Sequence, residues 1–372
     1  MRLPRIIPSR LLRRRSARLP RAASSSSADV SRHEVPELLH VVATRHGIGV
    51  FDEAWFEYRQ LLLERVTLAS LDAQTSKNFV WMIVIDRDMP KLARKHLDDM
   101  IADRSYIRLV EVELKRDFKG EVMKWVGKLA SKRGAKWVLT TRLDDDDAIH
   151  RDMIAKLQRE SRAVLDLDEQ RNTVFAPVLG CNWVPSELKG YRSFHPSPSM
   201  GLSLLEMASE FRTVYDKNHM KLASQLAPTG ARIRTIDDDT MWWLYAHTWI
   251  SDQHREGSNR RNRAYTHTHA FEFDEALLQR FGISLEGAEL LKNTPEPEPA
   301  DTTHYLTDRG SDLEREIVEL RRALKRRAYT DDEEASRMRE RIAELHAERK
   351  ELHRVIVRSP GQPRPSEERV SE

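Results

Sequence analysis

Short apolar runs alternate with segments of helical periodicity over the first 150 residues of the chain. The runs are LLHVVATR at 38–45, FVWMIVID at 79–86, YIRLVEVEL at 106–114 and KWVLTTRL at 136–143. A near-continuous apolar run such as 79–86 is typical of a strand that is buried on both faces. Between the runs, apolar residues recur every three or four positions, which predicts amphipathic helices.

Strands that alternate with helices of this length predict an α/β fold with a mostly parallel, doubly wound sheet. Ligands of such sheets bind beyond the carboxyl ends of the strands. Three of the four predicted strands end in polar candidates: Thr44 and Arg45, then Asp86, then an acidic cluster that starts at Asp144. We therefore expect the functional site at this edge of the sheet.

The pattern is looser after residue 174. The segment TVFAPVLGCNWVP predicts one or two strands, and SPSMGLSLLEMASEFRTVYDK predicts a loop that leads into a helix. The acids of TIDDDTMWW have two interpretations: a catalytic role, or caps of a helix that begins near Thr240.

The C-terminal part has a different pattern. PEPEP at 295–299 predicts a semi-rigid linker. After it, apolar residues in two segments keep a spacing of three and four, which suits either a helical hairpin or a coiled coil used for oligomerisation. We therefore divide the chain into an arm at 1–35, a catalytic domain at 36–293, a linker at 294–310, the helical pair at 311–357 and a disordered tail at 358–372.

Charge is distributed unevenly along the chain. Eight arginines and no acid lie within residues 1–28, and without them the formal net charge falls from +3 to −5. The arm suits a transit peptide, a solvated tail or contact with anionic lipid. Because the rest of the chain is acidic, nucleic acid is not an expected partner. The single cysteine, Cys181, excludes an internal disulfide framework and fits a reducing compartment.

Four consecutive aspartates follow the fourth predicted strand, in the segment TTRLDDDDAIHRDM. Two carboxylates separated by one residue suit a hard divalent cation, because Mg²⁺ is held by one or two carboxylates together with substrate phosphates. Such a metal would relieve the repulsion within the cluster and stabilise a leaving phosphate. The alternative is a solvated loop in which Asp146 or Asp147 caps the helix that follows.

These segments resemble a glycosyltransferase of the A-type fold, and within that fold a bacterial family of rhamnosyltransferases. The likeness is carried by VVATRHGIG, FVWMIVIDRDMP, KWVLTTRLDDDDAIHRDMI and WISDQHREGSN, and it extends over about 38–273. It implies that Asp144 and Asp146 are the metal-binding acids of a DxD motif. It also implies nucleotide contacts from Thr44 and Arg45, and a nucleoside contact from Asp86.

Further site residues complete the prediction. An inverting transfer needs a base for the acceptor hydroxyl, and Asp237, Asp238 and Asp239 are the candidates; a retaining enzyme would not need one. The basic segment DQHREGSNRRNR could close over a diphosphate, because arginine pairs bidentately with phosphate and histidine binds metals. We assign donor binding to Arg142, Asp145, Arg255 and Arg260, and a metal contact to His254.

We therefore expect a cytoplasmic, metal-dependent glycosyltransferase that uses Mn²⁺ or Mg²⁺ and a nucleotide-diphospho-sugar. The acceptor would be a glycan or another hydroxyl compound, as in surface polysaccharide synthesis, and the arm could touch the inner membrane face. The alternative is a non-catalytic scaffold that acts through its arm and its C-terminal helices, with self-association as an option. A nicotinamide-dependent enzyme is disfavoured because no G-x-G-x-x-G follows the first strand.

Overall fold

Two strands of the main sheet in the computed structural model, β1 (Leu38–His46) and β2 (Val80–Asp86), are adjacent and parallel. Side chains alternate between the two faces of a strand. Val42 and Trp81 therefore pack into one apolar core, whereas Val41 and Met82 pack into another on the opposite face. Both faces are covered, which explains why these runs are apolar throughout.

The structure describes residues 37–166, 171–246, 248, 270–299, 303–327, 332–352 and 357–358. The described elements belong to one compact unit. Its main sheet has seven strands, in the spatial order β10 (Arg232–Ile236), β6 (Thr173–Pro177), β9 (Ser203–Met207), β4 (Trp137–Arg142), β1, β2 and β3 (Ile107–Val112). Neighbouring strands are parallel except at β9, which is antiparallel to both β4 and β6. The predicted mostly parallel α/β sheet is confirmed.

A second sheet extends from the end of β4. Its spatial order is β12 (Ala270–Glu272), β8 (Lys189–Phe194), β7 (Leu179–Val184), β11 (Trp243–Ala246) and β5 (Ala148–Ile149). A short antiparallel pair joins β13 (Glu298–Pro299) to β14 (Val357–Arg358). Because β5 begins directly after the four aspartates, the acidic cluster lies at the junction between the two large sheets.

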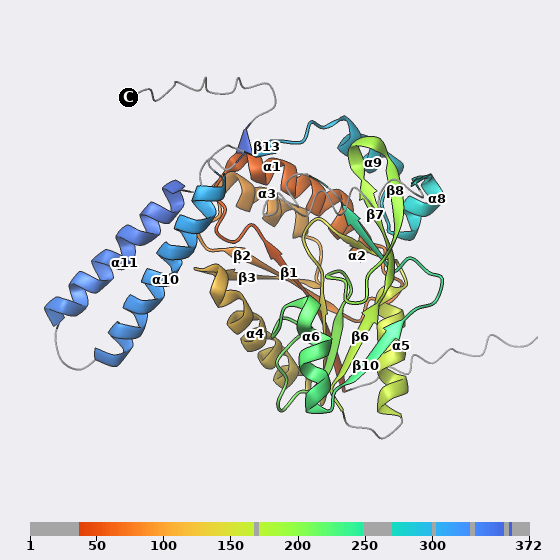
Figure 1. The fold of residues 1–372 in the computed structure, drawn as a ribbon, viewed down its shortest axis with the longest axis horizontal. Helices are drawn as coiled ribbons and strands as arrows, with labels where there is room; N and C mark the ends of the chain where they lie inside the picture. The colour runs from red at the N-terminus through yellow and green to blue at the C-terminus, as the bar shows by residue number, and fades with distance from the viewer. Residues whose placement is uncertain are drawn as a thin grey trace, which may run out of the picture. The chain divides into compact units, whose positions relative to one another are not determined.

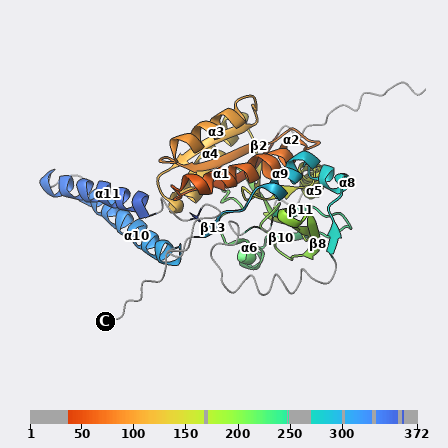
Figure 2. The same cartoon turned by 90° about the horizontal axis from the view of Figure 1, so that it is seen from above.

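Helices cover both faces of the main sheet (Figures 1 and 2). One face carries the continuous segment α1 (Glu53–Leu62), η1 (Leu63–Leu68) and α2 (Ala69–Asp72), together with α3 (Lys91–Ile101), α5 (Met153–Leu165), α8 (Glu275–Arg280) and α9 (Leu285–Asn293). The other carries α4 (Phe118–Arg133) and α6 (His219–Leu226). The helix α4 ends at Gly134, which adopts the left-handed conformation with φ of 62°.

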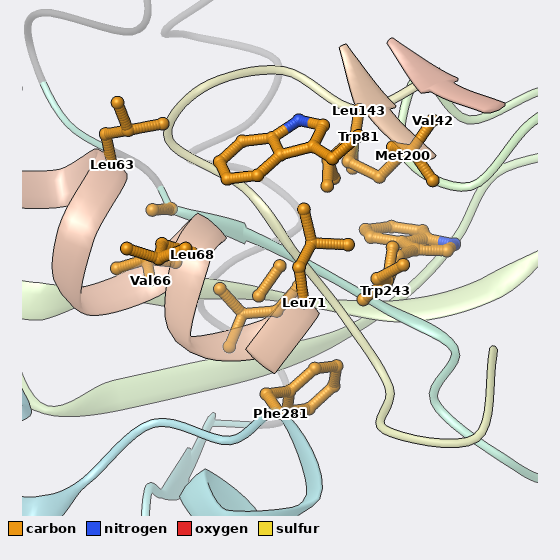
Figure 3. Close-up of a cluster of buried hydrophobic side chains, with 14 of the residues drawn as sticks. Val42, Leu63, Val66, Leu68, Leu71, Trp81, Leu143, Met200, Trp243 and Phe281 are labelled. Atoms are coloured by element: carbon orange, nitrogen blue, oxygen red, sulfur yellow. The ribbon is translucent and has the colours of Figure 1, made fainter. Parts of the chain in front are cut away.

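The larger core lies between this helical layer and the sheets. Figure 3 shows Trp81 and Trp243 in that core with Leu71 and Phe281, which come from distant parts of the sequence. Both of these tryptophans make hydrogen bonds through Nε1: Trp81 donates to Thr44 Oγ1 at 2.8 Å, and Trp243 donates to the Pro177 carbonyl at 2.9 Å. These aromatic residues therefore stabilise the fold.

Two predictions of local structure are wrong. The segment predicted as a loop before a helix contains β9, which lies inside the main sheet, and the helix expected near Thr240 is the strand β11. In both places pairing with flanking strands decides the conformation: β9 is held between β4 and β6, and β11 between β7 and β5. A sequence pattern does not contain these long-range partners.

Two long helices, α10 (Thr303–Arg327) and α11 (Asp332–Leu352), lie side by side as a hairpin (Figures 1 and 2). The first begins inside the range predicted as linker. Leu313, Ile317 and Leu345 are buried and form a third apolar core with Leu114, which follows β3. The hairpin thus docks on the carboxyl-end edge of the main sheet. No helix among the described residues has the length and apolar character to cross a membrane.

Candidate functional site

The register of the sheet brings the predicted strand-end residues together. Arg45 pairs with Val84, one residue from the end of β1 and two from the end of β2, and Ala43 pairs with Arg142 at the end of β4. Since β4, β1 and β2 are parallel neighbours, their carboxyl ends open at one edge. The chain passes from β1 to β2 on one side of β1, whereas β4 is added later on the other side. This reversal is a topological switch point, where α/β sheets bind ligands.

Three of the four aspartates are buried by protein partners. Arg59 of α1 donates from Nη2 to Asp145 Oδ1 at 2.5 Å and from Nη1 to Asp146 Oδ2 at 2.7 Å. The Nδ1 of His46 donates to Asp145 Oδ2 at 2.6 Å. The fourth member, Asp147, accepts from the Ala246 backbone N–H of β11 at 3.3 Å. The cluster therefore ties together β1, α1, β4 and the second sheet.

This arrangement corrects two expectations. A guanidinium and an imidazole from the chain already offset the repulsion at Asp145 and Asp146, so relief by a metal is not required there. Neither Asp146 nor Asp147 caps a helix, because β5 follows them and α5 begins only at Met153 with Asp152 at its N-cap. Asp145, Asp146 and Asp147 thus have partners within the chain, whereas Asp144 differs.

The pKa values within the cluster diverge. Burial by itself would raise the pKa of Asp145, but Arg59 and His46 outweigh it and hold that pKa well below its usual range. For Asp147, burial raises the pKa well above its usual value, and the charges of Asp146 and Asp144 add to that rise. Asp145 is therefore ionised, whereas Asp147 is the member of this pair that takes up a proton more readily.

Asp144 is the exception, since its side chain is 24% exposed and lies 3.7 Å from Arg142 Nη2. Burial would raise the pKa of Asp144, yet Arg142 and Arg45 together lower it. The two arginines stack on aromatic rings, Arg45 at 5.7 Å from the Phe118 centroid and Arg142 at 5.2 Å from that of Tyr215. Their Nε groups are buried without a hydrogen-bond partner in the described part of the chain. Two positioned guanidiniums beside one open carboxylate form an anion-binding arrangement.

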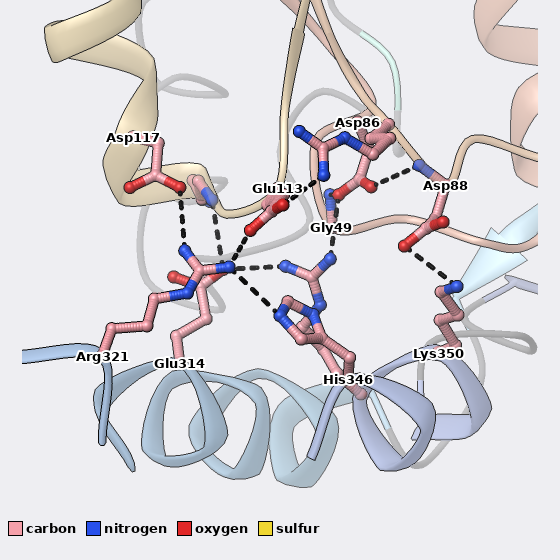
Figure 4. A network of polar contacts seen from close by, with 12 residues as sticks. Gly49, Asp86, Asp88, Glu113, Asp117, Glu314, Arg321, His346 and Lys350 are labelled. Atoms are coloured by element: carbon pink, nitrogen blue, oxygen red, sulfur yellow. Dashed lines mark hydrogen bonds and ion pairs between the residues drawn. The ribbon is translucent and has the colours of Figure 1, made fainter. Parts of the chain in front are cut away.

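Two other predicted site residues, Thr44 and Asp86, make hydrogen bonds with buried groups of the protein. Thr44 is fully buried and its hydroxyl accepts from Trp81, so its side chain does not reach the Asp144 group. Asp86 is also fully buried. Its Oδ2 accepts from the Gly49 N–H at 3.0 Å and from Arg349 Nη2 at 3.2 Å (Figure 4). Burial raises the pKa of Asp86, although Arg349 and the backbone N–H groups of Asp88 and Gly49 act to lower it.

The predicted base candidates follow β10, at the same edge as Asp144. Three strand spacings separate β10 from β4, or about 14 Å. Asp238 is held by Lys156 at 3.2 Å and by the Trp242 Nε1–H at 2.8 Å. Desolvation opposes these contacts, but they lower the pKa of Asp238 below its usual value. Asp237 and Asp239 are exposed, and Arg192 lies 3.5 Å from Asp239.

Three predicted residues, His254, Arg255 and Arg260, lie outside the described residues. Two important ones were not predicted: Arg59 and Arg349. Each occupies an apolar position of its helix, Arg59 four residues after Trp55 and Arg349 four after Leu345. A cation on the buried face of a helix needs an anionic partner, and this signal could have identified both.

The mostly parallel α/β sheet, with acids and arginines at its switch point, agrees with the fold class predicted from the sequence. The sequence profile of the family described as "Putative rhamnosyl transferase" matches residues 40–249, more than half of the chain. The chain belongs to this family of glycosyltransferases. No curated protein matches its sequence.

Solved structures with similar folds include TarS 1–349 of S. aureus in complex with UDP and a 4-diphosphocytidyl-2C-methyl-D-erythritol synthase. The first has 12% identity and a TM-score of 0.33, covering 85% of this chain and 90% of its own. The second has 14% identity and a TM-score of 0.31, covering 55% of this chain and 90% of its own. At these scores the likenesses add nothing to the strand order and site geometry given above.

Proposed function

We propose that the protein transfers a sugar, rhamnose by the family's description, from a nucleoside-diphosphate donor to a hydroxyl acceptor. One observation carries the proposal beyond the family: Arg45 and Arg142 flank the open Asp144 carboxylate at the switch point. A diphosphate carries negative charge on several oxygens and suits two guanidiniums that are fixed by stacking. Polysaccharide synthesis at the inner membrane face is the setting that we propose.

We also propose that Mg²⁺ or Mn²⁺ assists the transfer, with Asp144 as the protein ligand. An ionised, partly exposed carboxylate fits a hard cation, and Mg²⁺ needs only one or two carboxylates when phosphates supply the rest. Within the described ranges no group of three or more His, Cys, Asp or Glu side chains could hold a metal ion. Asp146 would have to leave Arg59 to join as a second ligand. A bound metal would stabilise the departing diphosphate.

The acceptor base of an inverting reaction is proposed to come from the acids after β10. A base needs a pKa that suits proton transfer at the working pH. Lys156 and Trp242 stabilise the ionised form of Asp238, which disfavours Asp238 as a proton acceptor. We therefore propose Asp237 or Asp239 as the base.

Calorimetric titration with UDP, dTDP, GDP and CDP, with and without Mn²⁺, tests this function. Arg142→Met should weaken binding of the preferred nucleotide at least 10-fold, because a charge-assisted hydrogen bond contributes about 1.5–3 kcal/mol. Asp144→Asn should remove the Mn²⁺ dependence. Arg94→Met, on the exposed face of α3, is the matched control.

In a transfer assay, Asp237→Asn or Asp239→Asn should abolish turnover with nucleotide binding kept. A folded protein that binds none of the four nucleotides contradicts the proposal and favours a scaffold.

A further inference from the structure

The C-terminal hairpin places a cation on the strand-end acid at β2. Arg349 of α11 is 1% exposed and Asp86 is 0% exposed, although 263 residues separate them. Each Asp86 oxygen is occupied, because Oδ1 accepts from the Asp88 N–H at 2.9 Å while Oδ2 accepts from Gly49 and Arg349. As docked, the hairpin leaves this acid no exposed oxygen for a ligand.

The guanidinium of Arg349 has the chemistry of a nucleobase edge. It is planar, it lies 5.4 Å from the centroid of the Phe51 ring, and it points an in-plane N–H at a carboxylate. A base with an amide or imide N–H offers the same pair of contacts: a flat face for an aromatic ring and a hydrogen-bond donor for an acid. Phe51 and Asp86 thus form a subsite for a flat donor group, and the chain supplies one itself.

Among the described residues, the hairpin contacts the sheet region through a small apolar core and a set of polar pairs. Its apolar core has four fully buried members, far fewer than either core of the sheet domain. At its margins Lys350 pairs with Asp88 at 2.9 Å, and Arg321 pairs with Glu113 and, at 3.6 Å, with Asp117 (Figure 4). These marginal pairs are partly exposed, and such pairs contribute little. Undocking the hairpin would let water reach Asp86 and Arg349 without disturbing the main sheet.

We propose that Arg349 is an internal stand-in for the nucleobase, so that docking of the α10–α11 hairpin and binding of the donor nucleotide exclude one another. This inference rests on the proposed function, whose diphosphate site lies at the neighbouring ends of β1 and β4. The hairpin is an autoinhibitory element: whatever draws it away from the sheet opens the base subsite. The ligand that competes with it is a nucleotide whose base carries an amide or imide N–H.

The test uses the full chain and weakens docking at Arg321, whose acidic partners Glu113 and Asp117 are not part of the subsite. Arg321→Glu turns an attraction to Glu113 and Asp117 into repulsion and leaves Phe51, Asp86 and Arg349 intact. The control is Arg315→Glu, the same charge change on the same helix at an exposed residue that pairs with Asp312. Arg349→Met is the second variant, which removes the guanidinium itself; thermal unfolding shows whether it folds.

Two readouts are compared: carbodiimide labelling of the Asp86 carboxyl, followed by peptide mass spectrometry, and the dissociation constant of the preferred nucleotide. We expect Asp86 to be protected in the wild type and in Arg315→Glu, and labelled in Arg321→Glu. The dissociation constant should fall at least 10-fold in Arg321→Glu and in a folded Arg349→Met, and stay unchanged in Arg315→Glu.

The other outcomes separate the two proposals. Rapid labelling of Asp86 in the wild type, or equal or weaker nucleotide binding by Arg321→Glu, overturns the autoinhibitory hairpin and leaves the transferase function standing. Absence of nucleotide binding by every variant, with Asp86 labelled in Arg321→Glu, overturns the transferase function and the competition that rests on it.

Discussion

Two buried acidic positions at the same edge of the sheet are neutralised in different ways. At the end of β4, Asp145 and Asp146 are held by Arg59, which comes from the helix that directly follows β1. At the end of β2, Asp86 is held by Arg349, which comes from a separate helical pair near the end of the sequence. In both cases a guanidinium pairs with a carboxylate. Arg59 belongs to a helix that packs on the sheet, whereas Arg349 belongs to the C-terminal hairpin.

The difference determines what happens when each pair opens. Arg59 cannot leave without disrupting α1 and the core beneath it, so its pair is part of the fold. Arg349 can leave with its hairpin, and water then solvates both partners. A buried ion pair is costly to break only if the remaining charge stays buried. Arg59 therefore contributes mainly to stability, whereas Arg349 is placed to control access.

Breaking the β4 pair should have the largest effect. Arg59→Met leaves Asp145 and Asp146 buried without their guanidinium, and we expect a loss of about 3–5 kcal/mol in the free energy of unfolding. Urea denaturation measures it. Arg94→Met removes two surface ion pairs, with Asp98 and Glu111, and should cost no more than about 1 kcal/mol. Similar losses in the two variants would contradict a structural role for Arg59.

Breaking the β2 pair should cost less. In Arg349→Met the hairpin can undock and expose Asp86 to water, so we expect the sheet domain to lose at most about 1 kcal/mol. Hydrogen exchange should accelerate across α11 and remain slow in β1 and β2. If the sheet domain is destabilised as much as by Arg59→Met, the hairpin is an integral part of the fold and the distinction fails.

The smallest expected effect is on the pH dependence of stability, and it compares Asp147 with Asp145 in the aspartate cluster. The folded-state pKa of Asp147 is raised by burial and by its acidic neighbours. Its contribution to the free energy of unfolding is therefore most favourable below the unfolded pKa of about 4, and it is lost as the pH rises through the folded-state pKa. Asp147→Asn keeps an oxygen for the Ala246 N–H. It should stabilise the protein at pH 7 more than at pH 4, as measured by thermal unfolding.

Asp145 behaves in the opposite direction, since its folded pKa is lowered. Its contribution is present above the unfolded pKa and is lost as the pH falls, so Asp145→Asn should destabilise the protein most at neutral pH. Equal effects of the two substitutions on the pH dependence would show that the cluster titrates as one undivided group.

The sequence determined much of this protein. Runs such as 79–86 and the helical spacing between them predicted the parallel sheet, and they placed the acids and arginines of the strand ends at one edge of it. Both are local signals: burial on two faces requires an apolar run, and parallel strands bring their carboxyl ends to one edge. The family match agrees with that prediction.

Only the tertiary structure decided which of those polar side chains are exposed and which are buried against partners. Asp144 is open because Arg59 and His46 engage its neighbours, and Asp86 is closed because Arg349 reaches it from the far end of the chain. The strands β9 and β11 likewise depend on partners that are distant in sequence. Periodicity records whether a side chain is buried, whereas the partner that balances a buried charge is set by the folding of remote segments together.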